Sequence, residues 1–582
     1  MTEAVQKKDH KASYLSKPWL KSYPPGLEVE VKIPEISLVE AFDQAVSRWT
    51  KKTALVFYGE KISYLELKNA VDRLATALYR QGVRKGDRVA IYMLNCPQFP
   101  IAYFAALKAG AVLTTISPVY VTSEIKHQIE DSGAEHIICL DILYDLVKKT
   151  GLTFKTVTLT RIDEYLPRIK KLFGKTILRN IYQKMEIPVV EIDKSEDVRW
   201  LQDILKGTEP DPPKISFRPK EDLAVLPYTG GTTGLPKGVM LTHYNLIAQA
   251  TINQAFWSYS FEHGRGLVEG SEVMAAYLPF YHIFGQVTVL ISGLIRGYKL
   301  IIFTTPDLDD ILKSVGSDGV TFFLGVPSLY EMLKDYDKTD RVNWKRLKFI
   351  MSGSDALLEQ TSKDWERRVH APIFDGLGLS ETSSGTHLNP LGKPKIGSFG
   401  VPMPNITAGL MDPDTGEFVG IGEIGELVVK GPSVTSGYWK NPGETEKALF
   451  EMDGEKWLRT GDLARIDEEG YFYFYDRKRD LIKYKGYSVF AREVEEVLKS
   501  HPKIRDAAVI GVPDPSVGAN IKAAIVTESD ARGKLSEEDV IEYCKQRLAH
   551  YKVPKIVEFR GEIPKTDVGK VSRRELREEM EI

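Results

Sequence analysis

Hydrophobic residues recur at two different spacings along this chain. Over residues 37–49 and 64–79 they return every three or four positions, which predicts helices with one buried side. Later come short, largely apolar runs with β-branched residues, which predict buried strands. These runs are residues 88–93, 109–113, 135–140 and 299–303. Helices that alternate with buried strands favour an α/β fold with parallel and mixed sheets.

The end of the chain predicts a second, smaller domain. Residues 470–475 predict a strand, and residues 476–480 form a dense charge cluster. Helical spacing follows at 491–499 and 537–548, and strand-like runs follow at 507–512 and 522–527. We therefore expect a large N-terminal domain over residues 1–478 and a small, mobile α+β C-terminal domain over residues 479–582.

Composition indicates a globular protein in a reducing compartment. The 582 residues are 43% hydrophobic and 27% charged, which excludes wholesale disorder or a fibrous repeat. A formal net charge of -2 gives no general attraction to phosphate backbones, so we expect no nucleic-acid partner. Cys96, Cys139 and Cys544 lack the paired spacing of a disulfide framework or zinc site, and a cytoplasmic location is expected.

Membrane contact is left open by one segment. Residues 1–21 lack the apolar stretch of a signal peptide or anchor, and the apolar run 287–295 is too short to span a bilayer. Residues 168–184, the basic insert, place lysines and arginines around an apolar helical side. We expect this side to pack on its own domain, with weak peripheral membrane contact as the alternative.

A glycine- and threonine-rich segment carries the most specific chemistry. Residues 228–238 read YTGGTTGLPKG and follow the apolar run 223–226. Glycines let the backbone turn its N–H groups to an anion, threonine hydroxyls add donors, and Lys237 adds positive charge. A flexible surface loop would explain the glycines and threonines but not their combination with Lys237 after a predicted strand. The spacing between the glycines and the Gly-Lys pair excludes a Walker A loop. The predicted phosphate-binding residues are Thr229, Gly230, Gly231, Thr232, Thr233, Gly234 and Lys237.

This segment closely resembles the phosphate-loop signature of the adenylate-forming superfamily, which includes acyl-CoA synthetases, carrier-protein adenylation domains and luciferases. Further segments follow in the superfamily's order, so the resemblance covers nearly the whole chain. It implies ATP and Mg²⁺ as cofactors, coenzyme A as co-substrate, a small carboxylic acid as substrate, and Thr229 and Glu381 as metal ligands.

Residues 278–285, LPFYHIFG, resemble the superfamily's aromatic motif. The resemblance implies that His282 lies beside the acyl pocket near the reacting carboxylate, and that Phe284 and Gly285 belong to the same substrate site. Without the resemblance, a lone histidine among aromatic residues is usually a hydrogen-bonded core residue.

Residues 375–382, DGLGLSET, resemble the segment in which a serine contacts the α-phosphate and a glutamate holds Mg²⁺. This implies those roles for Ser380 and Glu381, and oxygen ligands suit Mg²⁺. Read alone, Glu381 would be an ordinary surface carboxylate. The other nucleotide-site residues implied here are Gly353, Gly376, Leu377 and Gly378.

Two positions depart from the superfamily's pattern. Leu377 stands where an aromatic ring usually lies on adenine, and leucine loses the ring stacking. Asp355 stands in a segment that commonly has glycine and alanine ahead of a proline. The effect of both residues on nucleotide binding is left open.

Two later segments add to the implied nucleotide site and hinge. Residues 459–463 resemble the ribose-binding segment, with Asp462 as the acceptor, although an isolated aspartate is more often a turn residue. Residues 476–483 resemble the hinge, with Arg479 at the hinge position, although a charge run is by default solvated. Arg477 and Lys483 join the nucleotide site, and Gly486 and Tyr487 join the pantetheine tunnel.

Residues 564–570, PKTDVGK, resemble the C-terminal motif whose last lysine reaches the carboxylate and the α-phosphate. Lys570 is therefore implied to be catalytic, together with Lys237, Glu381 and His282. The resemblance implies an AMP-forming acid–CoA ligase, and residues 17–24 with the basic insert favour a long- or medium-chain fatty acid.

Alternatives remain at this point. The acid can instead be short, hydroxylated or aromatic, and a catalytically silent nucleotide-binding homologue is the alternative from another class. The presence of Glu381, Asp462 and Lys570 argues against the silent homologue. The preferred acid and the formation of a homodimer are left open.

Overall fold

The computed structural model describes residues 10–167, 192, 197–229, 236–305, 307–485, 487–565 and 571–579. It forms two compact units. The larger unit consists of Trp19–Thr407 and Lys430–Leu458, and the smaller unit of Met1–Pro18, Ala408–Val429 and Arg459–Ile582. The domain boundary expected at 478–479 falls within the smaller unit and stays a prediction. The basic insert lies outside the described residues.

A seven-stranded sheet of the larger unit confirms the predicted α/β alternation. Its order is β11-β8-β4-β3-β5-β6-β7, and only β11 is antiparallel to its neighbour. The strands are β3 (Arg88–Tyr92), β4 (Val112–Thr115), β5 (His136–Leu140), β6 (Thr156–Thr160), β7 (Arg199–Trp200), β8 (Leu223–Val225) and β11 (Leu241–Thr242).

One strand of this sheet begins later than predicted. The apolar run 109–113 predicted a strand, but Ala109 caps helix α4 (Gln98–Lys108) and Gly110 follows with φ 92°. This left-handed conformation ends a helix, and glycine adopts it without steric cost. β4 therefore starts only at Val112.

A nine-stranded sheet forms the rest of the larger unit's framework, in the order β18-β17-β16-β15-β14-β12-β13-β1-β2. The strands from β16 to β1 run parallel, and their antiparallel neighbours close both edges. β14 and β15 are buried at every position, as expected for central parallel strands. The strands are β1 (Thr53–Phe57), β2 (Glu60–Ser63), β12 (Val273–Ala276), β13 (Lys299–Ile302), β14 (Phe322–Gly325), β15 (Phe349–Ser352), β16 (Phe374–Leu379), β17 (Ser384–Leu388) and β18 (Val401–Pro402).

The two helices predicted near the start of the chain are present. α2 (Leu38–Trp49) is capped by Ser37, whose hydroxyl accepts the Glu40 N–H, and α3 (Tyr64–Arg80) begins with a capping box at Ser63. The other helices of this unit are α5 (Thr122–Ser132), α6 (Tyr144–Lys149), α8 (Leu201–Gly207), α9 (His243–Ser258), α10 (Ser292–Ile295), α11 (Leu308–Ser317), α12 (Pro327–Asp335), α13 (Glu359–Val369) and α14 (Pro442–Ala448).

The later part of the chain forms two five-stranded sheets. β22 (Glu455–Ile466) begins in the larger unit, where it pairs with β21 (Leu449–Met452). Its later residues pair with β20 (Ile424–Lys430) and β23 (Phe472–Arg477), and β19 (Thr407–Met411) completes this sheet.

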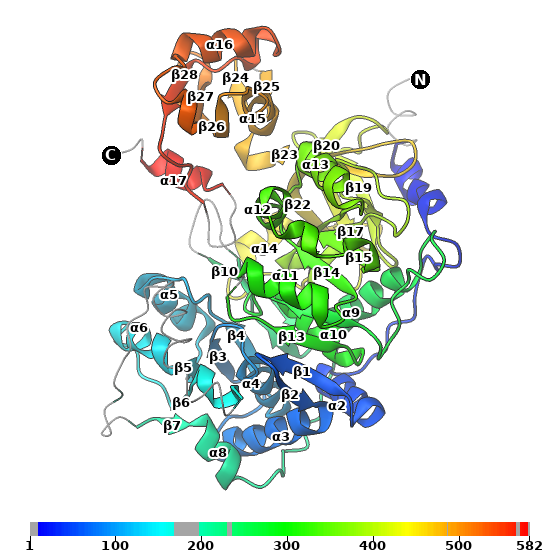
Figure 1. Cartoon of the computed structure of the whole chain (residues 1–582), viewed down its shortest axis with the longest axis vertical. Coiled ribbons are helices and arrows are strands. Elements are labelled where there is room, and N and C mark those ends of the chain that lie inside the picture. Colours follow the sequence, from blue (N-terminus) through cyan, green and yellow to red (C-terminus); the bar gives the residue numbers. More distant parts are fainter. Residues whose placement is uncertain are drawn as a thin grey trace. The chain divides into compact units, whose positions relative to one another are not determined.

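The second sheet confirms the predicted α+β region near the end of the chain. Its strands are β24 (Ile482–Tyr484), β25 (Tyr487–Val489), β26 (Ile504–Asp514), β27 (Gly518–Thr527) and β28 (Ile556–Phe559). α15 (Ala491–Lys499) and α16 (Glu537–Lys545) lie against this sheet (Figure 1), and α17 (Arg573–Glu578) follows. Val494, Val509, Ile525 and Val540 are part of the shared core.

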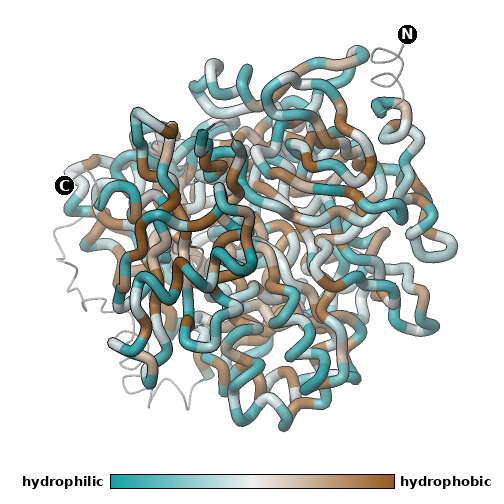
Figure 2. The backbone as a smooth tube through the Cα atoms, turned by 90° about the horizontal axis from the view of Figure 1, so that it is seen from above, coloured by the Kyte–Doolittle hydropathy of each residue, from teal (hydrophilic) through white to brown (hydrophobic). Residues whose placement is uncertain are grey.

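No helix among the described residues has both the length and the apolar character that crossing a bilayer requires. Hydrophobic and hydrophilic stretches alternate at short intervals along the tube in Figure 2. The apolar run 287–295 is buried, as predicted, in the π-helix Phe284–Ile291 and in α10.

Candidate active site

The two ends of the predicted phosphate loop are joined by a short hairpin. β9 (Tyr228–Thr229) pairs antiparallel with β10 (Lys237–Gly238), which places Thr229 opposite Lys237. The loop residues Gly230, Gly231, Thr232, Thr233 and Gly234 lie outside the described residues. The hairpin brings a hydroxyl and an ammonium group to the base of the loop.

Lys237 lies between a carboxylate and an aromatic ring. Its Nζ forms an ion pair with Glu444 of α14 and lies 5.5 Å from the centroid of the Tyr438 ring. Lys447, one helical turn after Glu444, forms a second ion pair with it at 2.7 Å. The hydrogen bonds from Lys237 and then Lys447 lower the pKa of Glu444 to about 2, so this carboxylate is charged at neutral pH.

The same tyrosine reaches the predicted metal ligand. The Tyr438 hydroxyl donates to Glu381 Oε1 at 2.7 Å, and the Thr435 N–H donates to the Glu381 carbonyl oxygen at 2.7 Å. Burial and then the charge of Glu381 raise the pKa of Tyr438, so its hydroxyl keeps its proton and acts as a donor. One ring therefore connects Lys237 and Glu381.

Tyr438 is held there by backbone pairing. The Met240 N–H donates to the Gly437 carbonyl oxygen at 2.9 Å, and the Trp439 N–H donates to the Gly238 carbonyl oxygen at 2.8 Å. Val239 and Tyr438 form an antiparallel bridge between these bonds. Residues far apart in the sequence are thus fixed beside the exit of the phosphate loop.

The sequence analysis did not identify Tyr438 or Glu444. Residues 437–445 read GYWKNPGET, which has no glycine-lysine phosphate pattern and no metal-ligand spacing. The available signal was two adjacent aromatic residues ahead of Asn441 and Pro442, which start α14. Their role depends on pairing with a distant segment, which local pattern does not reveal.

The glycines at the predicted adenine site are explained by packing. A Cβ at Gly378 would overlap the Ser384 carbonyl oxygen, and one at Gly376 would lie 2.9 Å from the His387 carbonyl oxygen. β16 and β17 could not pair this closely with side chains at these positions. Leu377 and Ser380, which are half-buried, extend the same segment towards Glu381.

The predicted acyl segment contacts the turn after β15. A Cβ at Gly353 would lie 3.2 Å from the Phe284 ring, so the absence of a side chain gives this ring its space. Asp355 is exposed, and its carboxylate accepts the Ala356 N–H at 2.9 Å. The structure therefore brings together Gly353, which the sequence analysis assigned to the nucleotide site, and Phe284, which it assigned to the substrate site.

Asn95, which follows β3 of the seven-stranded sheet, fixes the backbone of the aromatic motif. Its Oδ1 accepts the Phe280 N–H at 2.8 Å, and its Nδ2 donates to the carbonyl oxygens of Leu278 at 2.8 Å and Ala276 at 3.3 Å. Asn95 is buried, so its amide replaces water for these backbone groups. The sequence analysis did not single out this residue.

His282 and Gly285 follow this turn. The Phe284 N–H donates to His282 Nδ1 at 3.3 Å, which orients the half-buried imidazole. A Cβ at Gly285 would overlap the Pro279 carbonyl oxygen, so only glycine permits the turn into the π-helix. π-helical turns are rare and occur frequently at functional sites.

In the smaller unit, Asp462 and Arg477 are paired across two strands. They are opposite each other in the register of β22 and β23, and Arg477 Nη1 lies 2.5 Å from Asp462 Oδ1. Asp462 has no exposed surface, so its charge depends on such partners. Lys483 is exposed and lies 3.6 Å from Asp414 Oδ2.

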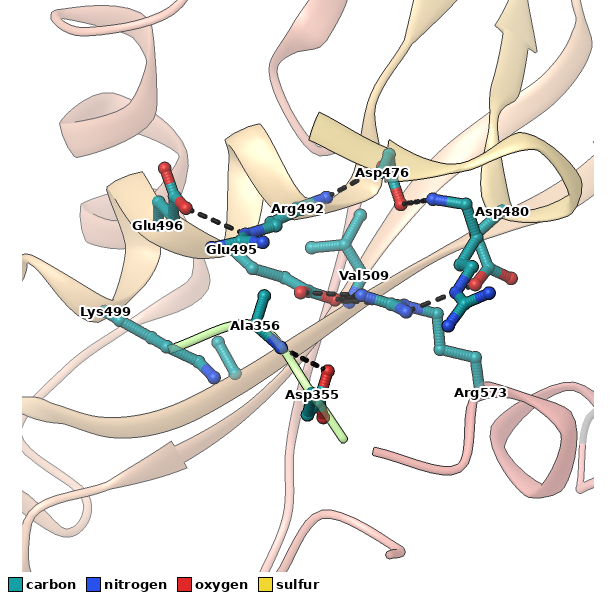
Figure 3. Close-up of polar contacts among 12 residues, drawn as sticks. Asp355, Ala356, Asp476, Asp480, Arg492, Glu495, Glu496, Lys499, Val509 and Arg573 are labelled. Atoms are coloured by element: carbon teal, nitrogen blue, oxygen red, sulfur yellow. Dashed lines mark hydrogen bonds and ion pairs between the residues drawn. The ribbon is translucent and has the colours of Figure 1, made fainter. Parts of the chain in front are cut away.

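The predicted hinge is not a uniformly solvated charge run. Asp480 is buried and forms ion pairs with Arg573 at 3.2 Å and Arg577 at 2.8 Å, whereas Arg479 is exposed. Arg573 also pairs with Glu495 at 2.7 Å, as Figure 3 shows. The exposed hinge residue therefore lies next to a buried ionic anchor.

A second carboxylate of this cluster is held by backbone groups. Asp476 accepts the Arg477 N–H at 2.7 Å. It also accepts the Arg492 N–H at 3.1 Å, as Figure 3 shows. Burial raises the pKa of Asp476 to about 6, against the opposing effect of Arg573. Both ends of the segment that contains Arg479 are thus fixed.

The C-terminal candidates are described only in part. Tyr487 is 54% exposed and stacks on Tyr551 with ring centroids 4.6 Å apart. Gly486 and Lys570 lie outside the described residues. Lys565 and Val571, on either side of the segment that ends at Lys570, form an antiparallel bridge.

Two sheets with covering helices, a strand pair that flanks the glycine-rich segment, and a carboxylate held by Tyr438 are typical of an enzyme that binds a phosphate-containing ligand. The chain belongs to the AMP-binding enzyme family. The family model described as AMP-binding enzyme matches residues 42–439, and the model described as AMP-binding enzyme C-terminal domain matches residues 493–570. The predicted superfamily and fold class are confirmed.

Named relatives and solved structures are similar over nearly the whole chain. A long-chain-fatty-acid–CoA ligase of Bacillus subtilis (strain 168) is 38% identical over 97% of this chain and 98% of its own length. ATP-bound MatB from Rhodopseudomonas palustris has 27% identity and a TM-score of 0.79, covering 94% of this chain and 99% of its own. A long-chain-fatty-acid-CoA ligase (FadD1) from Archaeoglobus fulgidus has 26% identity and a TM-score of 0.65, covering 92% and 99%.

The role of Asn95 can be tested by Asn95→Ala. This variant leaves the buried Phe280 N–H without its acceptor, and we expect the free energy of unfolding to fall by about 1–3 kcal/mol. Denaturant unfolding measures the change. Asn343→Ala is the control, because Asn343 is exposed and its side chain makes no capping hydrogen bond. Equal unfolding curves for the two variants would contradict the role of Asn95.

Proposed function

We propose that this chain is an ATP-dependent acyl-CoA ligase, which activates a fatty acid as acyl-AMP, releases pyrophosphate and transfers the acyl group to coenzyme A. The family match across both parts of the chain supports the reaction type. The observation that carries the proposal within this molecule is the link from Lys237 through Tyr438 to Glu381. A cation lies over the Tyr438 ring, and an oxygen ligand accepts a hydrogen bond from the hydroxyl of the same ring.

The reaction needs a better leaving group than a carboxylate provides. The carboxylate oxygen attacks the α-phosphorus of ATP, and pyrophosphate leaves with the electron pair of the broken P–O bond. Lys237 and the N–H groups of its loop stabilise the negative charge on the phosphates, since preorganised donors and cations act most strongly where charge develops. Ser380, beside Glu381, would contact the α-phosphate.

The residues present fit a magnesium ion bound together with phosphates. Mg²⁺ usually takes one or two protein carboxylates plus substrate oxygens, and Glu381 with Thr229 offers such a set. Bound there, Mg²⁺ would neutralise part of the phosphate charge. Among the described residues no group of three or more His, Cys, Asp or Glu forms a metal site by itself.

The remaining site residues are assigned by the same proposal. Lys570 brings a second ammonium group to the α-phosphate, and His282 lies beside the reacting carboxylate. Asp462 and Arg477 hold the ribose, with Lys483 in the nucleotide site. We place the boundary of the small mobile domain at 478–479 with Arg479 as the hinge, and Gly486 and Tyr487 line the way in for coenzyme A.

A fatty acid is the substrate class that the relatives favour. The protein from Bacillus subtilis carries that specificity in its name. Phe280 and Phe284 of the acyl segment are buried, which suits an apolar chain. A cytoplasmic location, weak membrane contact through the basic insert and a homodimer stay predictions.

The substrate class can be tested by measuring AMP release that depends on coenzyme A, with acids from acetate to stearate and with hydroxy and aryl acids. An open apolar tunnel should raise kcat/KM by up to about fourfold per methylene, the equivalent of ~0.8 kcal/mol, until the tunnel is filled. A preference for a short, hydroxylated or aryl acid would reject the fatty-acid assignment but keep the reaction. ATP binding without AMP formation from any acid would indicate a silent homologue.

The role of Lys570 can be tested by separating the two half-reactions. Lys570→Ala should slow acyl-AMP formation by ~10²–10³, the scale for losing a preorganised charge stabiliser, and spare thioester formation from supplied acyl-AMP. Lys565→Ala is the matched control, because Lys565 is a nearby surface lysine paired with Asp506 at 3.4 Å. Equal damage by Lys570→Ala to both half-reactions would refute the role.

A further inference from the structure

The ion pair between Lys237 and Glu444 competes with the proposed function of Lys237. An ammonium group that stabilises phosphate charge cannot keep a carboxylate in the same place, because the carboxylate and the phosphate repel each other. The Glu444 side chain is 30% exposed and that of Lys237 is 24% exposed, so water reaches both groups. A bound triphosphate would therefore have to replace this carboxylate.

Glu444 has a second cation to which it can turn. Lys447 lies on the same helix, one turn further, and contacts the other carboxylate oxygen at 2.7 Å. α14 has no buried residue, and the Asn441 side chain, which accepts the Glu444 N–H at 3.2 Å, holds its first turn. The Glu444 side chain can therefore leave Lys237 without unfolding the helix or losing every partner.

Lys237 itself would stay in position when Glu444 leaves. The ammonium group lies over the Tyr438 ring, and Tyr438 is fixed by the bridge to Val239 and by its hydrogen bond to Glu381. An aromatic face stabilises a nearby cation without carrying a charge of its own. The ring can thus hold the ammonium group of Lys237 in place whichever anion Lys237 binds.

We propose that Glu444 is a competing counter-ion for Lys237, which the triphosphate of ATP displaces onto Lys447. Glu444 is then a positioning residue that acts through Lys237. It sets how tightly nucleotides with a phosphate chain bind, and it does not affect recognition of the nucleoside. This inference rests on the proposed phosphate-binding role of Lys237.

The experiment compares Glu444→Gln with Glu446→Gln. Glu446 is an exposed carboxylate on the same helix, so both variants remove one negative charge from α14. Binding of a non-hydrolysable ATP analogue and of adenosine is measured by titration calorimetry with Mg²⁺ and without acid or coenzyme A. We expect Glu444→Gln to bind the analogue about two- to fivefold more tightly, the scale of an exposed ion pair, with adenosine binding unchanged.

Three results would overturn the proposal. They are weaker or unchanged binding of the analogue by Glu444→Gln, an equal gain for adenosine, and an equal gain from Glu446→Gln. If Glu444→Gln does not fold, Glu444→Asp replaces it, because the shorter side chain keeps the charge but loses reach to Lys237. The same sign is then expected with a smaller factor.

Lys447→Gln tests the second cation in a double-mutant cycle. Without Lys447, the ion pair between Glu444 and Lys237 should be stronger. The Lys447→Gln variant should therefore bind the ATP analogue more weakly than the wild-type protein does. In the Glu444→Gln background the loss should shrink, and the difference between the two losses isolates the pairwise coupling. Equal losses in both backgrounds would show a simple charge effect and would reject displacement onto Lys447.

This test can fail separately from the proposed function. If the protein binds the ATP analogue but forms no acyl-AMP, the ligase assignment is rejected. The effect of Glu444→Gln on analogue binding can still be measured in that case. If the protein forms acyl-AMP and Glu444→Gln does not change binding of the analogue, only the proposed counter-ion role of Glu444 is rejected.

Discussion

The candidate active site is organised around one tyrosine ring that contacts both a cation and an anion. Lys237 lies over the face of Tyr438, and the hydroxyl of the same ring donates to Glu381. Lys237 lies on β10 and Glu381 in the 3-10 helix Ser380–Thr382, so the two charged groups belong to segments far apart in the sequence. The backbone bridge between Val239 and Tyr438 sets this arrangement, so the position of a reactive group depends on ordinary strand pairing.

Much of the framework could be predicted from the sequence, because burial imposes a regular spacing on hydrophobic residues. The predicted segments for α2, α3, β3, β5 and β13 follow this spacing, and the structure contains these elements at nearly the predicted bounds. β4 starts at Val112 instead of residue 109, because the first residues of its apolar run form the cap of α4 and the turn at Gly110. Spacing detects burial, and it does not show where one buried element ends and the next begins.

The candidate site was only partly predictable, for a different reason. Glycine-rich segments and single charged residues in a known order pointed to Lys237, Glu381 and Asp462. Tyr438, Glu444 and Asn95 have no such local signal, because each acts through a partner from another part of the chain. The structure also gives Gly376 and Gly378 a packing role, which the resemblance to nucleotide-binding segments did not indicate.

The central claim is that a carboxylate oxygen of the acid attacks the α-phosphorus of ATP. The most direct test is to supply a fatty acid labelled with ¹⁸O in its carboxylate, together with ATP, Mg²⁺ and coenzyme A, and to measure the label in the products by mass spectrometry. Attack at the α-phosphorus leaves one labelled oxygen in AMP when the acyl group is transferred. Unlabelled AMP, or label found in inorganic phosphate alongside ADP, would contradict the account.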